Sequence, residues 1–454
     1  MSSHRSIAIV GAGPVGCVLA TLLARRGFDV EIFEKRPDMR RADISGGRSI
    51  NLVLTDRGLR ALERIGLRDQ ILELTVPVLG RMMHSIDAEL SYQPYGKDDS
   101  ECNYSVSRGG LNEFLLDAAA DSGVEIHFDH ELIDVDVERG RLIFEGGAEH
   151  EAGVIFGCDG APSAVRRAMV ERCGIEESVE FMSWGYKELL FPAGPDGTYR
   201  MEKNALHIWP RGQHFLMGLA NLDGSFTGTL YLPRQGANSF DELDEPRKLR
   251  EFFDEYYADA VDLLGDFVDE FLKHPTGKLG TVRCAPWHVD GRVLLVGDAA
   301  HGIVPFFGQG LNCGFEDCVV LDELLSEEGD LESVFETFFR ARKPNTDAIA
   351  DMALENAVEM GEKVADPGFL MRKKVESILE REFSTLYRSR YAMVMYSTIP
   401  YRVAFEIGEV QEQILAELSE GLQRPQDLDL EGAGELIDRR LRPLYERHDV
   451  DLRF

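Results

Sequence analysis

The spacing of hydrophobic residues predicts a strand, a turn, a helix and a second strand at the start of the chain. Residues 6–10 form a continuous apolar run, which is typical of a strand buried on both faces of a parallel sheet. The apolar residues Val15, Leu19, Leu22 and Leu23 then recur at helical spacing. An α/β unit with a parallel sheet is therefore predicted at the start of the sequence.

The pattern changes near residue 180 and again near residue 331. Between about residues 180 and 233, short apolar segments separated by turn residues predict antiparallel strands. These segments are 185–192, 205–210, 214–222 and 225–233. From about residue 331 the pattern is helical nearly to the end.

The order of these regions implies interleaved domains, because an α/β pattern returns at about residues 293–320 after the β region. We expect a discontinuous α/β domain over 1–75, 100–175 and 280–330. A β domain is expected over 76–99 and 176–279. Residues 331–454 are expected to form a C-terminal helical region.

Composition and charge narrow the class of protein. The 454 residues carry 49 basic and 80 acidic side chains, a net charge of −31. Such a charge disfavours binding to nucleic acid or anionic membranes and favours a protein that acts on small molecules. Seven scattered cysteines without a CxxC pair suggest reduced thiols. With no leader or apolar span apparent, we expect a cytoplasmic protein, either monomer or homodimer.

The first motif with a chemical meaning is Gly11-Ala-Gly13-Pro-Val-Gly16, placed between the first strand and the first helix. Glycines at this spacing allow a tight turn and a close approach of the backbone to a pyrophosphate, which the helix N-terminus then faces. Glu34 ends the second strand, where a carboxylate can accept the ribose hydroxyls. The motif predicts dinucleotide binding.

Two later motifs contain an aspartate at the end of an apolar strand. Asp159-Gly160 precedes Ser163 and Arg166, and taken alone it reads as the capped start of a helix. Gly297-Asp298 follows the apolar run 293–296, at the strand end where α/β folds bind ligands. The next helix should begin near residues 310–312, with free N–H groups at its start.

In this order the three motifs resemble the aromatic hydroxylase class of flavoprotein monooxygenases. Further segments resemble the kynurenine 3-monooxygenase family within that class, among them "GGRSINLVLTDRGLRALERIGL" and "HGIVPFFGQGLNCGFEDC". The similarity is dense over residues 1–320 and thinner over 345–400. The resemblance implies an α/β fold in which an FAD-binding Rossmann-like domain is interleaved with an antiparallel β-sheet substrate domain and followed by helices.

The resemblance also implies an activity. Members of the family use FAD, NADPH and O2 to hydroxylate L-kynurenine to 3-hydroxykynurenine through a flavin C4a-hydroperoxide. The electron-rich ring of the substrate needs no strong protein base, so we nominate no catalytic acid or base. A dry pocket protects the oxygen intermediate, and Phe306 and Phe307 are suited to exclude water from it.

Site residues follow from the resemblance position by position. The expected cofactor-binding residues are Gly11, Gly13, Gly16, Glu34, Arg48, Arg108, Asp159, Gly297, Asp298, Gly310, Leu311 and Asn312. The expected substrate-binding residues are Arg81, Tyr95, Phe306, Asn356, Glu359, Met360 and Tyr391.

Two of these residues have an ordinary structural alternative. Asn356 interrupts an apolar helical stripe formed by Ile349, Met352, Ala353 and Met360, so it is either a core amide bonded to a carbonyl or a ligand to the substrate. A lone arginine such as Arg81 is most often a solvated surface residue. A tyrosine beside it makes carboxylate binding plausible.

Other interpretations stay open. The substrate could be a ring-substituted kynurenine or another aminoaryl acid, and a flavin-binding protein without turnover is a remote alternative. A flavin-dependent halogenase is disfavoured, because the tryptophans do not form the WxWxIP segment. We expect no metal site. His127 and His130 are discounted as ligands, because residues i and i+3 of a strand point to opposite faces. His301 is expected in a loop near the flavin edge.

Overall fold

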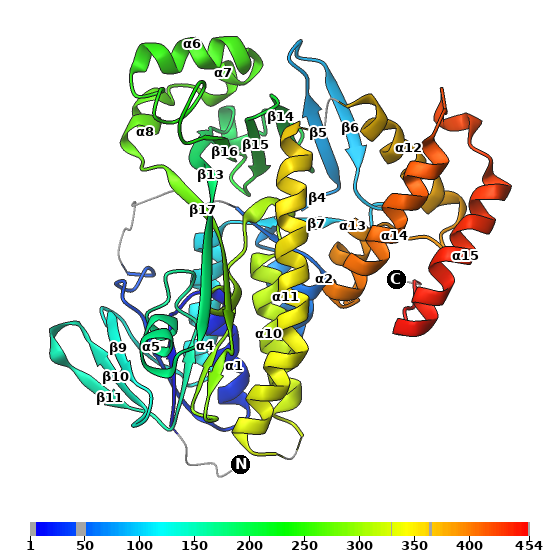
Figure 1. The fold of residues 1–454 in the computed structure, drawn as a ribbon. Helices are drawn as coiled ribbons and strands as arrows, with labels where there is room; N and C mark the ends of the chain where they lie inside the picture. Colours follow the sequence, from blue (N-terminus) through cyan, green and yellow to red (C-terminus); the bar gives the residue numbers. More distant parts are fainter. Residues whose placement is uncertain (1–5, 42–50, 328, 363–365, 453–454) are drawn as a thin grey trace. The chain divides into compact units, whose positions relative to one another are not determined.

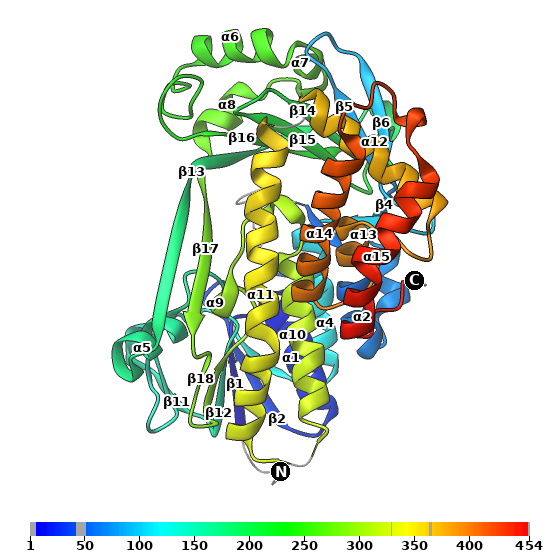
Figure 2. The ribbon, with the colours of Figure 1, turned by 45° about the vertical axis from the view of Figure 1, so that its right-hand side comes forward.

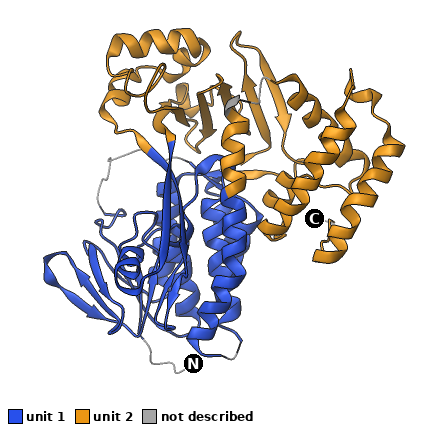
Figure 3. Ribbon diagram, in the orientation of Figure 1, with its two compact units in different colours: residues 1–76, 105–182, 278–350 blue, residues 77–104, 183–277, 351–454 orange. Residues whose placement is uncertain are grey.

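The computed structural model describes residues 6–41, 51–327, 329–362 and 366–452. The chain divides into two compact units, each made of three segments (Figure 3). The first unit contains residues 1–76, 105–182 and 278–350, and the second contains 77–104, 183–277 and 351–454. The elements β4, β7, β13, β17 and α11 have residues in both ranges.

The first unit contains the N-terminal segment of the chain, which is dark blue in Figure 1. A six-stranded sheet forms the core of this unit, in the order β18-β19-β12-β1-β2-β8. Its strands are β1 Ser6–Val10, β2 Asp29–Phe33, β8 Glu125–His127, β12 Val154–Gly157, β18 His288–Val289 and β19 Val293–Leu295. The central strand β1 pairs in parallel with both β2 and β12. Its apolar residues from Ile7 to Val10 are buried, as a strand covered on both faces requires.

Helices and a small antiparallel sheet complete the first unit. The small sheet has the order β11-β10-β9, with β9 Leu132–Asp136, β10 Arg141–Phe144 and β11 Glu149–Glu151. The helices are α1 Pro14–Arg25, α2 Asp56–Arg64, α3 Arg68–Leu72, α4 Arg108–Asp121, α5 Ala164–Cys173, α9 Asp298–His301 and α10 Gly310–Leu324. The short strands β3 Leu52–Leu54, β4 Thr75–Val78 and β7 Asn103–Val106 form a further sheet of order β3-β7-β4.

A seven-stranded sheet dominates the second unit, in the order β17-β13-β16-β15-β14-β5-β6. Its strands are β5 Gly80–His84, β6 Leu90–Pro94, β13 Glu176–Phe191, β14 Ala205–Pro210, β15 Phe215–Ala220, β16 Phe226–Pro233 and β17 Gly277–Ala285. The second half of β13 alternates buried and half-buried residues, which is the period of a strand with one covered face.

Two groups of helices belong to the second unit. The first group is α6 Pro246–Tyr256, α7 Ala258–Leu264 and α8 Val268–Lys273. The second group is α12 Pro367–Glu382, α13 Arg390–Met395, α14 Tyr401–Ser419 and α15 Leu430–His448, in which α14 contacts the other three (Figure 2). The long helix α11, Leu331–Glu362, has residues in both units.

The fold class expected from the sequence is confirmed: an α/β part with a parallel sheet, a largely antiparallel sheet and C-terminal helices. The antiparallel segments expected between residues 185 and 233 are β13, β14, β15 and β16. Within the part of the chain that the structure describes, no helix is long and apolar enough to cross a membrane.

Candidate active site

The glycine turn after β1 has the geometry of a pyrophosphate-binding turn. Gly11 has φ +102°, and a Cβ there would lie 2.5 Å from the carbonyl oxygen of Cys158. A Cβ on Gly16 would lie 2.1 Å from the carbonyl oxygen of Gly11. At Gly13, by contrast, an added Cβ meets no atom within 4 Å. The first and third glycines are therefore needed for packing, and the second borders open space where a phosphate can approach.

Glu34 lies directly beside this turn. The N–H of Ala12 donates to its Oε2 at 2.9 Å, and the N–H and Nε of Arg36 donate to its Oε1 at 3.0 and 2.8 Å. Burial alone would raise the pKa of Glu34, but the bonds from Arg36 and Ala12 outweigh it and lower the pKa. Glu34 is therefore a fixed carboxylate at the end of β2, as the ribose hydroxyls require.

The Gly297-Asp298 turn is held by a side chain from helix α10. Gly297 has φ +65°, and its N–H donates to Asp317 Oδ2 at 3.0 Å. Asp298 starts α9 and stays exposed. The surrounding protein desolvates the carboxylate and so raises the pKa of Asp298, although electrostatic interactions with His301 and Arg108 oppose the rise. Arg108 is thus near enough to Asp298 to act on it electrostatically, and contact of either residue with a cofactor stays a prediction.

Asp317 and Arg342 are central to this turn and were missed in the sequence. Asp317 Oδ2 also lies 2.5 Å from His301 Nε2, and its Oδ1 accepts a bond from Arg342 Nε at 2.7 Å. Arg342 extends from α11 and also donates to Glu316 at 2.6 Å. A buried cation needs a carboxylate partner. The sequence does not show which one, because Asp317 and Arg342 are 25 residues apart and only the folded chain brings them together.

Two predicted cofactor residues serve mainly local structure. Asp159 accepts from the Ser163 hydroxyl and from the N–H groups of Ala164 and Val165, so it caps the start of α5. Asn312 accepts from the N–H of Thr55 and donates to the carbonyls of Val53 and Gly308. The side chain of Asn312 is thereby used, which leaves its backbone N–H for a ligand. Contacts of either residue with a cofactor stay a prediction.

Helix α10 begins at Gly310, as expected, and a Cβ on Gly310 would lie 3.9 Å from Asp298 Oδ1. The first N–H groups of α10, including that of Leu311, have no partner within the helix and point out of its start. Phe306 and Phe307 precede it in a short 3-10 helix and are 8% and 7% exposed. Arg48 lies outside the described residues.

His301 differs from its prediction. It is the last residue of α9, only 4% exposed and bonded to Asp317, instead of a loop residue. The chain forms one helical turn directly after Gly297, so His301 faces inward.

The second unit gathers an arginine and two tyrosines. Arg81 Nε donates to the Tyr95 hydroxyl at 3.3 Å. Its guanidinium carbon lies 5.3 Å from the ring centre of Tyr95 and 5.8 Å from that of Tyr391. The two rings stack at 5.2 Å with an interplanar angle of 19°. Asn103, which the sequence did not single out, donates to the Tyr391 hydroxyl at 2.9 Å.

This arrangement suits a carboxylate ligand. Among the residues that the structure describes, no carboxylate lies within ion-pair distance of Arg81; its direct contacts are the two tyrosines, and Glu359 acts on it electrostatically from farther away. Arg81 is partly exposed, and the rings shield its flanks. A guanidinium with free donors between aromatic faces binds a carboxylate through two parallel hydrogen bonds.

The remaining predicted substrate residues of this unit lie on α11. The apolar stripe is confirmed, since Ile349, Met352, Ala353 and Met360 are all buried. Asn356 in the same stripe is only partly buried, and its Nδ2 lies 3.7 Å from Met360 Sδ. Glu359 pairs with Lys373 at 3.7 Å. Asn356 is therefore not a fully buried core amide.

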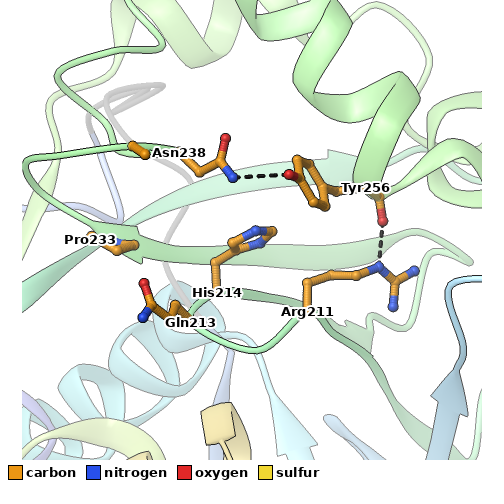
Figure 4. A pocket seen from close by; sticks show the side chains of 7 residues that line it. Arg211, Gln213, His214, Pro233, Asn238 and Tyr256 are labelled. Atoms are coloured by element: carbon orange, nitrogen blue, oxygen red, sulfur yellow. Dashed lines mark hydrogen bonds between the residues drawn. The ribbon is translucent and has the colours of Figure 1, made fainter.

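A cavity of about 260 Å³ lies elsewhere in the second unit (Figure 4). It is lined by Arg211, Gln213, His214, Pro233, Ala237, Asn238 and Tyr256. None of the predicted site residues lines it. Its polar groups bond one another, as Asn238 does with the Tyr256 hydroxyl at 3.1 Å. We assign it no role in the chemistry.

The glycine turn after β1, the carboxylate of Glu34 after β2 and the Gly297-Asp298 turn together have the character of a dinucleotide-binding fold. The family model described as FAD binding domain matches residues 4–352. Solved structures with the same fold include tetracycline destructase Tet(55), with a TM-score of 0.64 at 17% identity over 84% of this chain and 97% of that one. Another is 2-methyl-3-hydroxypyridine-5-carboxylic acid oxygenase, with a TM-score of 0.63 at 22% identity over 81% and 95%.

Similar proteins of known name show which family of FAD-binding proteins the chain belongs to. Kynurenine 3-monooxygenase of Myxococcus xanthus (strain DK1622) is 51% identical over 98% of this chain and 97% of its own length. That of Stenotrophomonas maltophilia (strain K279a) is 41% identical over 94% and 95%. The chain belongs to the kynurenine 3-monooxygenase family.

Proposed function

We propose that this protein hydroxylates L-kynurenine to 3-hydroxykynurenine, with FAD as its cofactor and with NADPH and O2 as co-substrates. The observation that carries the choice of substrate is Arg81 against Tyr95 and Tyr391, a cationic group with aromatic walls and no protein carboxylate partner among the described residues. Kynurenine offers an amino-acid carboxylate for the guanidinium and an aromatic ring for an apolar surface.

The residues of the first unit fit FAD. The open space at Gly13 receives the pyrophosphate, the ionised Glu34 accepts the ribose hydroxyls, and the exposed Asp298 accepts further hydroxyls. The N–H groups at the start of α10 supply donors. When bound and reduced by NADPH, FAD would activate O2, which supplies the oxygen atom of the new hydroxyl group.

The protein's own part in the reaction is binding and water exclusion. Arg81 and Tyr95 orient the amino-acid end of the substrate, while Phe306 and Phe307 present apolar surface that keeps water out. The amine of the substrate ring donates electron density to the carbon that is hydroxylated. No protein base is therefore assigned.

A second candidate is a ring-substituted kynurenine, since a carboxylate site also fits that molecule. The test is NADPH consumption with product identification, run with kynurenine and with several ring-substituted analogues. Kynurenine should stimulate NADPH oxidation and yield 3-hydroxykynurenine with the highest kcat/KM. If a substituted analogue has a higher kcat/KM than kynurenine, that analogue is the substrate. If no compound stimulates NADPH oxidation, the protein binds flavin without turning these substrates over.

Replacing Arg81 should damage substrate binding and spare the cofactor. We expect Arg81→Ala to raise KM for kynurenine about 10- to 100-fold, because a charge-assisted hydrogen-bonded pair contributes roughly 1.5–3 kcal/mol. FAD content should be unchanged, since Arg81 lies in the second unit and the FAD residues in the first. Steady-state kinetics and the flavin absorbance measure both.

Arg200→Ala provides the matched control. Arg200 belongs to the same unit, but its guanidinium donates hydrogen bonds to the backbone carbonyls of Leu263 and Asp262, at 3.0 and 2.7 Å. Its loss should leave KM for kynurenine within about twofold. An unchanged KM in Arg81→Ala would remove Arg81 from the site.

A further inference from the structure

A second cluster of ionisable side chains lies on one face of the parallel sheet in the first unit. Strands β2 and β8 pair in parallel with Glu31 opposite Glu125 and Phe33 opposite His127. Because side chains alternate along a strand, these four residues share one face of the sheet. Two carboxylates are thus directly opposite each other.

Strand β11 of the small antiparallel sheet contributes a second imidazole to the same place. His150 Nε2 lies 3.3 Å from Glu31 Oε1, while His127 Nε2 lies 2.7 Å from Glu31 Oε2 and 3.7 Å from Glu125 Oε1. The rings of His127 and His150 both pack against Phe33, with centroids 4.8 Å away in each case. Two imidazoles from different strands therefore lie against the two oxygens of the Glu31 carboxylate.

The two carboxylates of the cluster have no lysine or arginine to balance their charge among the ion pairs of the described residues. Like charges directly opposite each other destabilise a sheet unless a cation lies between them. The ion-pair partners of Glu31 and Glu125 among the described residues are histidines. The Nε2 atom of His150 is buried and makes no hydrogen bond, although it lies 3.3 Å from Glu31 Oε1. Both facts make these side chains a candidate ligand set for a cation.

We propose that Glu31, Glu125, His127 and His150 bind a divalent transition-metal ion, for which Zn²⁺ is the best match. Imidazole nitrogens with carboxylate oxygens are ordinary zinc ligands, and two carboxylates neutralise the charge of the ion. One ligand atom each from Glu31, Glu125 and His127 already lies within 4.8 Å of the others. His150 lies outside this group of three, with its Nε2 3.3 Å from the other oxygen of Glu31, and we propose it as the fourth ligand.

The cluster is accessible to an ion from solvent. The side chains of Glu31, His127 and His150 are 22%, 25% and 26% exposed, and that of Glu125 is 72% exposed. Another group with metal-ligating atoms, His301, Cys313 and Asp317, is a poor candidate. Both oxygens of Asp317 are already occupied there, by His301 and Gly297 on one and by Arg342 on the other.

The expectation that His127 and His130 point to opposite faces of one strand was wrong. Strand β8 ends at His127, and Asp129 has φ +58°, so the chain turns before His130. The rings of His127 and His130 consequently both lie on Phe33. His130, however, bonds the carbonyl of Phe128 at 2.7 Å and pairs with no carboxylate of the described residues. His127 finds its partner ligands on β2 and β11 instead.

A metal here would join three strands close to the cofactor site. Glu31 and Glu34 are three residues apart, and the N–H of Glu34 donates to the carbonyl of His127 at 2.9 Å. Bound Zn²⁺ would hold the edge strand β8 and strand β11 against β2. The expected role is stabilisation of the fold, because the proposed ligands lie on β2, β8 and β11 and none of them is a predicted substrate residue.

Calorimetric titration of the chelator-treated holoenzyme with Zn²⁺, in excess Mg²⁺ to occupy weak acidic sites, tests the proposal. We expect one equivalent of Zn²⁺ to bind and the thermal midpoint to rise. Glu31→Gln and His150→Ala should each weaken binding by about tenfold or more, since each removes a direct ligand. Co²⁺ in place of Zn²⁺ should give absorption bands that both variants lose.

His130→Ala is the matched control, because it removes an imidazole from the same Phe33 without removing a proposed ligand. It should bind Zn²⁺ as the parent does. Flavin absorbance of each variant verifies that the first unit is folded. Absence of stoichiometric binding in the parent, or equal binding in His150→Ala and the parent, would overturn the proposal in favour of protonated histidines that balance the carboxylates.

Discussion

At the scale of single residues, burial decides the charge of His214. Its ring is 4% exposed, and its Nδ1 lies 2.7 Å from the Tyr257 hydroxyl. Burial, assisted by the nearby positive charge of Arg211, lowers the pKa of His214 from 6.5 to about 4. The folded protein therefore holds this histidine neutral.

The lowered pKa predicts a loss of stability in acid. Between pH 6.5 and about 4 the unfolded chain binds a proton at His214 that the folded chain does not bind. The free energy of unfolding should therefore fall as pH decreases through this window, with a contribution on the order of 3 kcal/mol at most, and should be unaffected by His214 above it.

Urea unfolding at several pH values, compared between the parent and His214→Gln, measures this effect. Glutamine keeps a hydrogen-bond acceptor for Tyr257 but does not titrate. The variant should lose less stability than the parent between pH 6.5 and 4. Identical slopes for the two proteins would contradict the assignment of a neutral His214.

At the scale of elements, helix α10 connects the cofactor turn to the core of the first unit. Through Asp317 it accepts the N–H of Gly297, and through Glu316 it pairs with Arg57 of α2 and with Arg342 of α11. Through Asn312 it binds backbone groups around β3. Its side chains thus fix the loop that precedes it as well as the helix itself.

Asp317→Asn should therefore weaken both stability and flavin retention. Loss of this carboxylate leaves Arg342 and His301 with less compensating charge in a buried place, which typically costs about 3–5 kcal/mol. It also loosens the acceptor for Gly297, next to Asp298. Thermal unfolding and FAD release on dilution are the measurements.

Glu323→Gln on the same helix provides the comparison. Glu323 pairs with Arg60, and both side chains are more than 40% exposed. This variant should lose at most about 1 kcal/mol and retain FAD as the parent does. Equal effects of the two substitutions would mean that Asp317 has no special part in the cofactor turn.

At the scale of the whole molecule, the net charge of −31 affects the encounter with NADPH. NADPH is itself a polyanion, so the long-range field of the protein opposes its approach. Salt screens this repulsion over about 10 Å at 0.1 M ionic strength. We expect KM for NADPH to fall as ionic strength rises from low to physiological values.

Steady-state kinetics at fixed kynurenine and varied NADPH check this expectation. The value of kcat should change little, because screening acts on encounter and not on the bound complex. A KM for NADPH that rises with salt would contradict it and would indicate a local basic patch that attracts the dinucleotide in spite of the overall charge.

The sequence by itself determined the local parts of the site. Gly11, Gly16 and Glu34 were predictable because the turn after a strand depends on backbone freedom and spacing within a few tens of residues. The apolar stripe of α11 was likewise visible in its helical period. Resemblance to a family supplied Arg81, Tyr95 and Tyr391, which are up to 310 positions apart.

Only the tertiary structure decided which distant side chains share a partner. Asp317 binds Gly297 and Arg342, and His150 reaches Glu31 from a different sheet. Such pairings depend on which strands lie next to each other and on where a strand ends, as the turn at Asp129 before His130 illustrates. The physical reason is that burial and ion pairing act through space, whereas the patterns of a sequence report only neighbours along the chain.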